Sequence, residues 1–303
     1  MIAEVIASYG RHLLLRDADG GLHKARPLGR KLDIVCGDNV QCEWRGDELL
    51  VAEILPRRRS LMRSTLRGRS ELVAANLTQL AVVLAPLPAA DLFLLDRYLC
   101  AAESASLRAL VIINKNDMPG SAKLHQSLSA YVALGYEAIS ISASAGVAGI
   151  GVLAPALADH TTILAGQSGV GKSTLSRLLT DEAVDIAVGE LMREEEGRHT
   201  TTASRLYDCR TGGRIIDSPG VRDFAPAIDA LEPATLGFRE LAQLAGQCRF
   251  LDCRHMQEPG CAVRAATEAG TMDARRYESY RRLRRLYEEL WGKRSERDRA
   301  ARR

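Results

Sequence analysis

One short segment has the residue types and spacing of a phosphate-binding loop. The sequence GQSGVGKS matches the pattern G-x-x-x-x-G-K-[ST] and stands between an apolar segment, TTILA, and a helix-forming segment, KSTLSRLL. Small residues let successive backbone N–H groups point at phosphate oxygens, and the dipole of the following helix adds to the attraction. Lys172 is expected to reach the outer phosphates, and the Ser173 hydroxyl to bind Mg²⁺. The residues predicted to bind the nucleotide here are Gly166, Gln167, Ser168, Gly169, Val170, Gly171, Lys172, Ser173 and Thr174.

A second polar segment, NKND, indicates which base is bound. It follows the apolar segment ALVII, where ligands bind in open α/β sheets. A carboxylate at Asp117 can accept hydrogen bonds from the N1–H and the exocyclic amine of guanine, a pair of donors that adenine lacks. We therefore expect Asp117 to select guanine, Asn114 to tie the loop together and the Lys115 stem to cover the base. Ser142 and Ala143, after the segment EAISI, fit a backbone element that supports the base from its other side.

Two further segments fit the neighbourhood of the γ-phosphate. DSPG ends the strand-like segment RIID, so that Asp217 can hold the Mg²⁺ shell through water and the Gly220 N–H can bind the γ-phosphate. Such a loop is ordered by the triphosphate and released after hydrolysis. In GRHTTT we expect Thr201 to coordinate Mg²⁺, with Thr200 as the second choice; the threonines could instead form the edge of a strand.

Hydrolysis also needs a group that orients the attacking water. Val221 follows DSPG, and a valine side chain cannot hydrogen-bond water, so the isolated chain should turn over slowly. His199 is the best substitute, although it could be a solvated loop histidine. The predicted catalytic residues are thus His199, Lys172 and Thr201.

A cysteine-rich segment near the C-terminal end has the composition of a metal site. CRFLDCRHMQEPGC supplies Cys248, Cys253, His255 and Cys261, and three thiolates with one imidazole complete a tetrahedral shell with no open position. We therefore predict one structural Zn²⁺; buried cysteines beside a surface histidine are the alternative. Seven cysteines cannot all pair, and three of them cluster beside a histidine, which favours a metal in a reducing cytoplasm over disulfides. The other four are expected to be small buried residues.

The pattern of apolar residues predicts three parts that position these segments. Residues 1–64 contain the strand-like runs AEVIASY, HLLLRD, NVQCEW and ELLVAEI between glycine-containing turns, which suits an OB-fold barrel that binds RNA or the ribosome. Residues 65–231 alternate strands with helices, which predicts a mostly parallel sheet covered on both faces. Residues 232–303 are helical around the cysteine loop. Their last helix, 273–291, has an aromatic and leucine stripe expected in the core and arginines 281, 282, 284 and 285 on its other face.

The order of the nucleotide motifs is unusual. NKND and Ser142-Ala143 precede the phosphate loop, whereas in Ras-like GTPases they follow DxxG. A circular permutation explains this order, because a fold can still close when its old termini lie near each other and are joined. The expected fold class is therefore α/β: a circularly permuted P-loop GTPase domain with an N-terminal OB-fold β-barrel and a C-terminal helical zinc-binding domain.

Composition and charge are those of a globular protein with an anionic partner. The chain has 303 residues, 46% of them hydrophobic, and no apolar run long enough to span a membrane. Its net charge of +3 hides basic ends around an acidic centre. Basic flanks fit a nucleic acid, although a frayed basic C-terminus would give the same count.

The three parts together resemble a known family. A β-barrel, a permuted GTPase with GQSGVGKS, GRHTTT and DSPGV, and a C-x₄-C-x-H-x₅-C segment are similar to the bacterial RsgA (YjeQ or EngC) family of GTPases that depend on the small ribosomal subunit. The resemblance spans essentially the whole chain. It implies a late-acting assembly factor that binds rRNA through its OB and zinc domains and whose GTP hydrolysis is stimulated by the subunit. It also points to His199. We expect a cytoplasmic monomer whose partners are GTP or GDP, the small ribosomal subunit and its rRNA, and no membrane.

One other function stays open on the sequence alone, and a further one is disfavoured. The chain could be a nucleotide-tuned RNA-binding module or chaperone with only incidental hydrolysis. A P-loop ATPase or small-molecule kinase is disfavoured by Asp117 and by the absence of an evident acceptor pocket.

Overall fold

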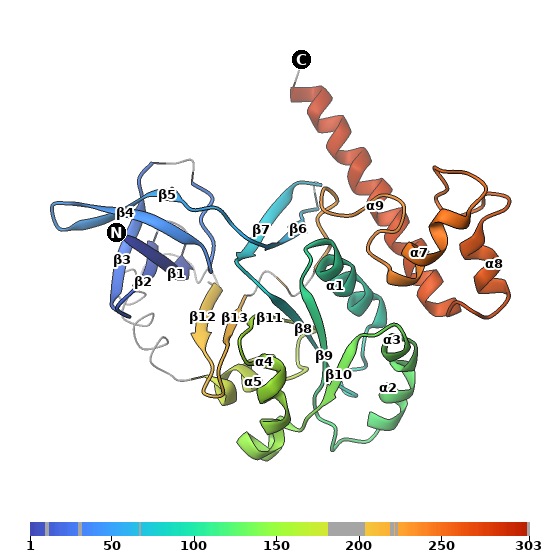
Figure 1. Ribbon diagram of the computed structural model, residues 1–303, viewed down its shortest axis with the longest axis horizontal. Coiled ribbons are helices and arrows are strands. Elements are labelled where there is room, and N and C mark those ends of the chain that lie inside the picture. Colours follow the sequence, from blue (N-terminus) through green and yellow to red (C-terminus); the bar gives the residue numbers. More distant parts are fainter. Residues whose placement is uncertain are drawn as a thin grey trace.

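The computed structural model describes residues 1–303 except 10–11, 30–31, 67, 181–203, 219–220, 222–223 and 302–303. A barrel, a sheet covered by helices and a helical end follow one another across the molecule (Figure 1). Within the described ranges, no helix combines the length and the apolar character needed to cross a membrane.

The N-terminal part is a closed five-stranded barrel, which confirms the predicted OB-fold. Its strands are β1 (Ile2–Tyr9), β2 (His12–Asp17), β3 (Leu22–Pro27), β4 (Asn39–Arg45) and β5 (Glu48–Ile54). The ring closes because β1 pairs with both β2 and β4, and β3 pairs with β5. Alternate residues such as Val40, Cys42, Leu49 and Val51 fill its core. The sequence pattern did not predict β3, because only Ala25 among its residues is buried.

The central part contains six strands that are neighbours in one sheet. These strands are β8 (Gln79–Leu84), β9 (Arg108–Ile113), β10 (Glu137–Ser140), β11 (Thr161–Ala165), β12 (Ser204–Asp208) and β13 (Arg214–Asp217). They lie in the order β10-β9-β8-β11-β13-β12. All neighbours are parallel except β12, which runs antiparallel to β13. The loops that follow the five parallel strands therefore share one edge of the sheet.

Helices cover both faces of this sheet, as predicted (Figure 1). One face carries α1 (Leu92–Ser104), α2 (Ser121–Ser127) and α3 (Ser129–Ala133), and the other carries η1 (Ala143–Leu153), α4 (Ala154–Leu157) and α5 (Lys172–Leu179). The fully buried strand β8 contacts the helices on both faces of the sheet. Leu80 and Val82 pack with α1, whereas Ala81 and Val83 pack with α5. Such a run is apolar throughout because neither face meets water.

The barrel and the sheet are joined by backbone pairing. Strand β1 lies antiparallel to β12, so one eleven-stranded sheet runs from the barrel through the central part. Between the two parts, β6 (Ser60–Ser64) and β7 (Ser70–Ala75) form a hairpin. Arg57 is bound to the fully buried carboxylate of Asp38, with N–O distances of 2.6 and 2.8 Å.

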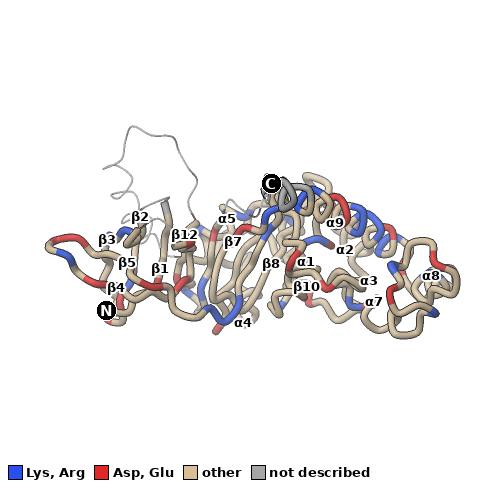
Figure 2. Tube along the Cα trace, turned by 90° about the horizontal axis from the view of Figure 1, so that it is seen from above, with Lys and Arg blue, Asp and Glu red and all other residues tan. Residues whose placement is uncertain are grey.

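The C-terminal part contains α7 (Arg239–Leu244), η3 (Ala245–Gln247), α8 (Ala262–Glu268) and α9 (Ala274–Ala301). Helix α9 continues ten residues beyond its predicted end, and Figure 2 shows basic residues along it. Tyr280, Leu283 and Leu290 are buried, as the stripe predicted. Arg284, expected on the other face, is also buried, because its guanidinium donates to the Tyr280 hydroxyl (2.7 Å) and to the Pro233 carbonyl.

A buried ion-pair cluster fixes this part against the central one. The Arg276 guanidinium of α9 is 1% exposed and pairs with Asp96 of α1 and with Glu240 of α7. The rings of Tyr131 and Phe238 lie 5.0 and 4.6 Å from its guanidinium carbon. Removing one member of such a cluster leaves an unpaired buried charge, so we expect the two parts to stay together.

Candidate functional site

The phosphate-binding segment forms the loop between β11 and α5. Gly166 has a φ of +131°, and a Cβ there would lie 2.2 Å from the Val83 carbonyl oxygen, so only glycine fits. The Lys172 ammonium group donates to the carbonyls of Gly166 (2.7 Å) and Gln167 (2.6 Å) and so folds back over the loop. Ser168, Gly169, Ser173 and Thr174 are exposed, so this side of the loop is open to a ligand.

Asn114 connects three segments that are far apart in the sequence. Its side chain is buried, its Nδ2 donates to the Val170 carbonyl (2.8 Å), and its Oδ1 accepts from the Ala143 N–H (3.1 Å). A Cβ on Gly171 would lie 2.3 Å from that same Nδ2. The NKND segment, the Ser142-Ala143 element and the phosphate loop therefore meet at the shared edge of the sheet.

Lys115 makes a second connection across this edge. Its ammonium group donates to the carbonyls of Leu87 and Gly169, each at 2.8 Å. The stem of the side chain thus runs from the NKND loop to the phosphate loop, along the side where a base bound by Asp117 would lie.

Asp117 is exposed and held by two serines. Its backbone N–H donates to the Ser142 Oγ (3.2 Å), and the Ser144 hydroxyl donates to its carboxylate (3.3 Å). Hydrogen bonding by Ser142 lowers the pKa of the Asp117 carboxyl below its ordinary value, and Ser144 adds to this. An ionised, solvent-facing carboxylate of this kind can accept the two donors of a guanine edge.

The residues predicted around the γ-phosphate are only partly described. Asp217 ends β13, next to β11 in the sheet, so it lies at the same edge as the phosphate loop. The neighbouring Ser218 is buried and accepts a hydrogen bond from the Ser204 hydroxyl (2.8 Å). His199, Thr200, Thr201 and Gly220 lie outside the described residues.

One contact of the phosphate loop has no signal in the sequence. The Asp91 N–H donates to the Gln167 Oε1 (2.9 Å), while the Asp91 carboxylate caps α1 by accepting from the N–H groups of Phe93 and Leu94. Asp91 is recognisable as the cap of a helix. Its contact with a residue of the phosphate loop depends on tertiary placement, which no short motif encodes.

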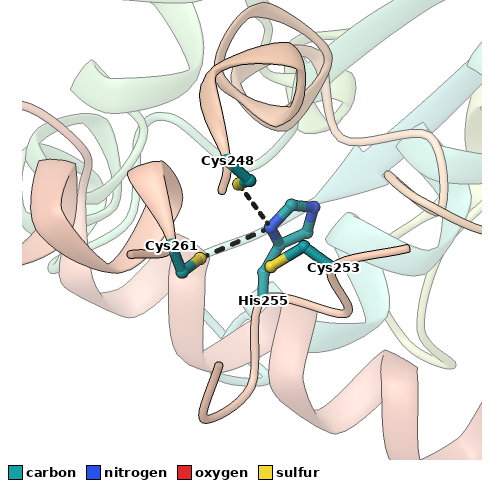
Figure 3. Close-up of side chains that lie close together, drawn as sticks. All are labelled: Cys248, Cys253, His255 and Cys261. Atoms are coloured by element: carbon teal, nitrogen blue, oxygen red, sulfur yellow. Dashed lines mark hydrogen bonds between the residues drawn. The ribbon is translucent and has the colours of Figure 1, made fainter. Parts of the chain in front are cut away.

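The four predicted metal ligands come together beside α9 (Figure 3). Their ligand atoms all lie within 4.8 Å of one another, and the His255 Nδ1 lies 3.4 Å from the Cys248 Sγ and 3.5 Å from the Cys261 Sγ. Ligands on a tetrahedral Zn²⁺ should be about 3.5 Å apart, given metal–ligand distances of about 2.3 and 2.0 Å. Burial raises the pKa of the Cys253 thiol to about 12, so its thiolate needs a cation beside it. The cluster can hold a metal ion.

A carboxylate and two tyrosines shape the backbone around His255. Glu258 accepts from the N–H groups of Arg254 (3.0 Å), Met256 (2.9 Å) and Gln257 (2.9 Å). Burial opposes the ionised form, but these donors outweigh it and lower the pKa of Glu258 to about 2. The hydroxyls of Tyr277 and Tyr280 donate to the carbonyls of His255 and Arg254. Glu258 was not identified from the sequence as part of this site. Its position between the predicted ligands His255 and Cys261 could have indicated it.

Comparison with known proteins identifies a family of GTPases. The profile of a family described as RsgA GTPase matches residues 54–226. A protein of Nitrosomonas europaea named small ribosomal subunit biogenesis GTPase RsgA is 40% identical over 290 residues, which is 93% of this chain and 90% of that protein. The crystal structure of YjeQ from Thermotoga maritima is similar with a TM-score of 0.69 and 26% identity, over 96% of this chain and 98% of the other. YloQ, a circularly permuted GTPase, has the same fold (TM-score 0.69, 24% identity, 95% of each chain).

Proposed function

The chain belongs to the RsgA GTPase family and is a GTPase, and we propose that it binds the small ribosomal subunit and acts in its late maturation. In this function it hydrolyses GTP to GDP and phosphate, and the subunit stimulates the hydrolysis. The observation that supports the nucleotide site best is the position of Asn114, which ties a guanine-selecting loop to a phosphate-binding loop.

We propose the following roles for the residues of that site. The loop from Gly166 to Thr174 surrounds the phosphates, and the Lys172 ammonium group exchanges the carbonyls of Gly166 and Gln167 for phosphate oxygens. Asp117 selects guanine between the Lys115 stem and the Ser142-Ala143 backbone. Ser173 and Thr201 would hold Mg²⁺, with Asp217 acting through water, and the ion would neutralise charge on the phosphates.

The water that attacks the γ-phosphate needs a partner other than Val221. The Val221 side chain is fully buried, and its carbonyl accepts from the Tyr98 hydroxyl, so this residue cannot hold water. We assign the water-orienting role to His199 and the γ-phosphate contact to the Gly220 N–H. Both assignments rest on the sequence.

We also propose one structural Zn²⁺ held by Cys248, Cys253, His255 and Cys261. The three domains would comprise residues 1–64, 65–231 and 232–303. The barrel and the zinc domain would bind rRNA, and the basic residues of α9 support this for the zinc domain (Figure 2). The protein would work in the cytoplasm as a monomer.

The test is GTP turnover with and without purified small ribosomal subunits, at stated salt because RNA binding depends on it. We expect strong stimulation that is lost in Lys172→Ala, since this residue carries the charge nearest the transferred group. Unstimulated turnover with intact GTP binding would instead favour the nucleotide-tuned RNA-binding module.

A further inference from the structure

Helix α1 contacts the chain just after the DSPG segment through one tyrosine. Tyr98 is fully buried, and its hydroxyl donates to the Val221 carbonyl. Its ring stacks on that of Phe224, with centroids 5.1 Å apart and an angle of 24° between the planes. Val221 and Phe224 are themselves 0% exposed. One side chain thus holds both the backbone and a side chain of this segment.

Helix α1, which carries Tyr98, is held at two points that precede this residue. At the N-terminus of α1, the N-cap residue Asp91 donates its N–H to Gln167 of the phosphate loop. One turn further along, Asp96 is buried in the ion pair with Arg276 of α9. A hydrogen bond from such a helix restrains the Val221 peptide relative to the phosphate loop.

We propose that Tyr98 is a positioning residue for GTP hydrolysis. Val221 directly follows Gly220, whose N–H is assigned to the γ-phosphate, so fixing the Val221 carbonyl fixes the end of the loop that must meet this phosphate. Without the hydroxyl, a buried carbonyl loses its partner, and the segment shifts to find another. The effect falls on GTP and spares GDP, which has no γ-phosphate. The inference rests on the proposed nucleotide site and adds a residue to it.

The experiment compares Tyr98→Phe with a matched control, Tyr136→Phe. Tyr136 belongs to the same hydrophobic cluster and is buried, and its hydroxyl has no hydrogen-bond partner in the part of the chain that the structure describes. Both variants lose one buried hydroxyl and keep the ring. The readouts are the affinities for GDP and for a non-hydrolysable GTP analogue, together with kcat and KM for GTP.

We expect Tyr98→Phe to weaken binding of the analogue by about five-fold, the equivalent of one hydrogen bond, and to lower kcat by a similar factor. GDP affinity should be unchanged, and Tyr136→Phe should alter neither nucleotide. If Tyr98→Phe lost affinity for GDP and for the analogue equally, Tyr98 would have only a structural role in the core, and the proposal would be wrong. Unchanged analogue affinity and kcat would also overturn it. Failure of the proposed function has a different result, because the wild-type protein itself would then show no subunit-stimulated turnover.

Discussion

The residues proposed for the nucleotide site come from loops between Asn114 and Gly220, whereas the four proposed metal ligands come from the stretch between Cys248 and Cys261. In the first site the loops hold one another: Asn114 bridges two of them, and Lys115 and Lys172 bind loop carbonyls. In the second, three sulfurs and a nitrogen lie within 4.8 Å of one another and could hold a metal ion. Protein contacts alone therefore hold the loops of the proposed nucleotide site together, whereas we expect the metal centre to depend more on its ion.

The largest effect that separates the two sites is expected from Cys253→Ala. Removing a ligand should lower zinc affinity by more than about 100-fold, which is the upper range for residues that merely support ligands. If the proposed ion orders this segment, residues 248–261 should also lose protection from hydrogen exchange. Zinc content and exchange are compared with those of Cys42→Ala, a buried barrel cysteine remote from the cluster. The comparison fails if Cys253→Ala keeps its zinc, or if GDP binding is lost along with the metal.

A smaller effect, at the nucleotide site and not at the metal centre, is expected from Asp117→Asn. The amide has one acceptor oxygen and cannot accept both donors of guanine, and the loss of one hydrogen bond to a charged group corresponds to roughly 10–10²-fold in GTP affinity. Xanthosine triphosphate, which offers an acceptor in place of the amine, should bind the variant better than GTP does. Zinc content should stay the same. Titration calorimetry with both nucleotides checks this, and Ser144→Ala serves as a control that removes only one supporting hydroxyl. Unaltered GTP affinity would mean that another residue reads the base.

The smallest change is expected at the nucleotide site on mild acidification. The pKa of Asp117 is lowered from its ordinary 3.8, so its carboxylate stays ionised at pH 5 and is lost only below that ordinary value. From this group GDP affinity should change by less than about two-fold between pH 7 and pH 5. The pKa of the Cys253 thiol is raised, so protons compete with zinc for this sulfur as the pH falls. Zinc should therefore be lost before GDP on acidification.

The control for this titration is GDP bound to Asp117→Asn, in which the base and the phosphates titrate equally but the carboxylate is absent. A steep loss of GDP affinity that the control does not share would show that Asp117 is protonated in this range.

The sequence predicted the local features of both sites well, because a motif and its flanking elements are short. Asn114 as the residue that ties the loops and the Cys₃His cluster both follow from short motifs. Contacts that depend on packing between distant elements did not follow. Gln167 with Asp91, Tyr98 with Val221 and Arg276 with Asp96 each join segments whose approach no periodicity encodes.

Strand β12 has neighbours on both sides, β13 from the central sheet and β1 from the barrel. A shortened chain that begins after the barrel would leave one side of β12 with unpaired N–H and C=O groups. Such an edge is a template for pairing with other chains, so the isolated central part should aggregate more readily than the whole protein. The barrel thus protects the GTPase sheet from self-association, whatever else it binds.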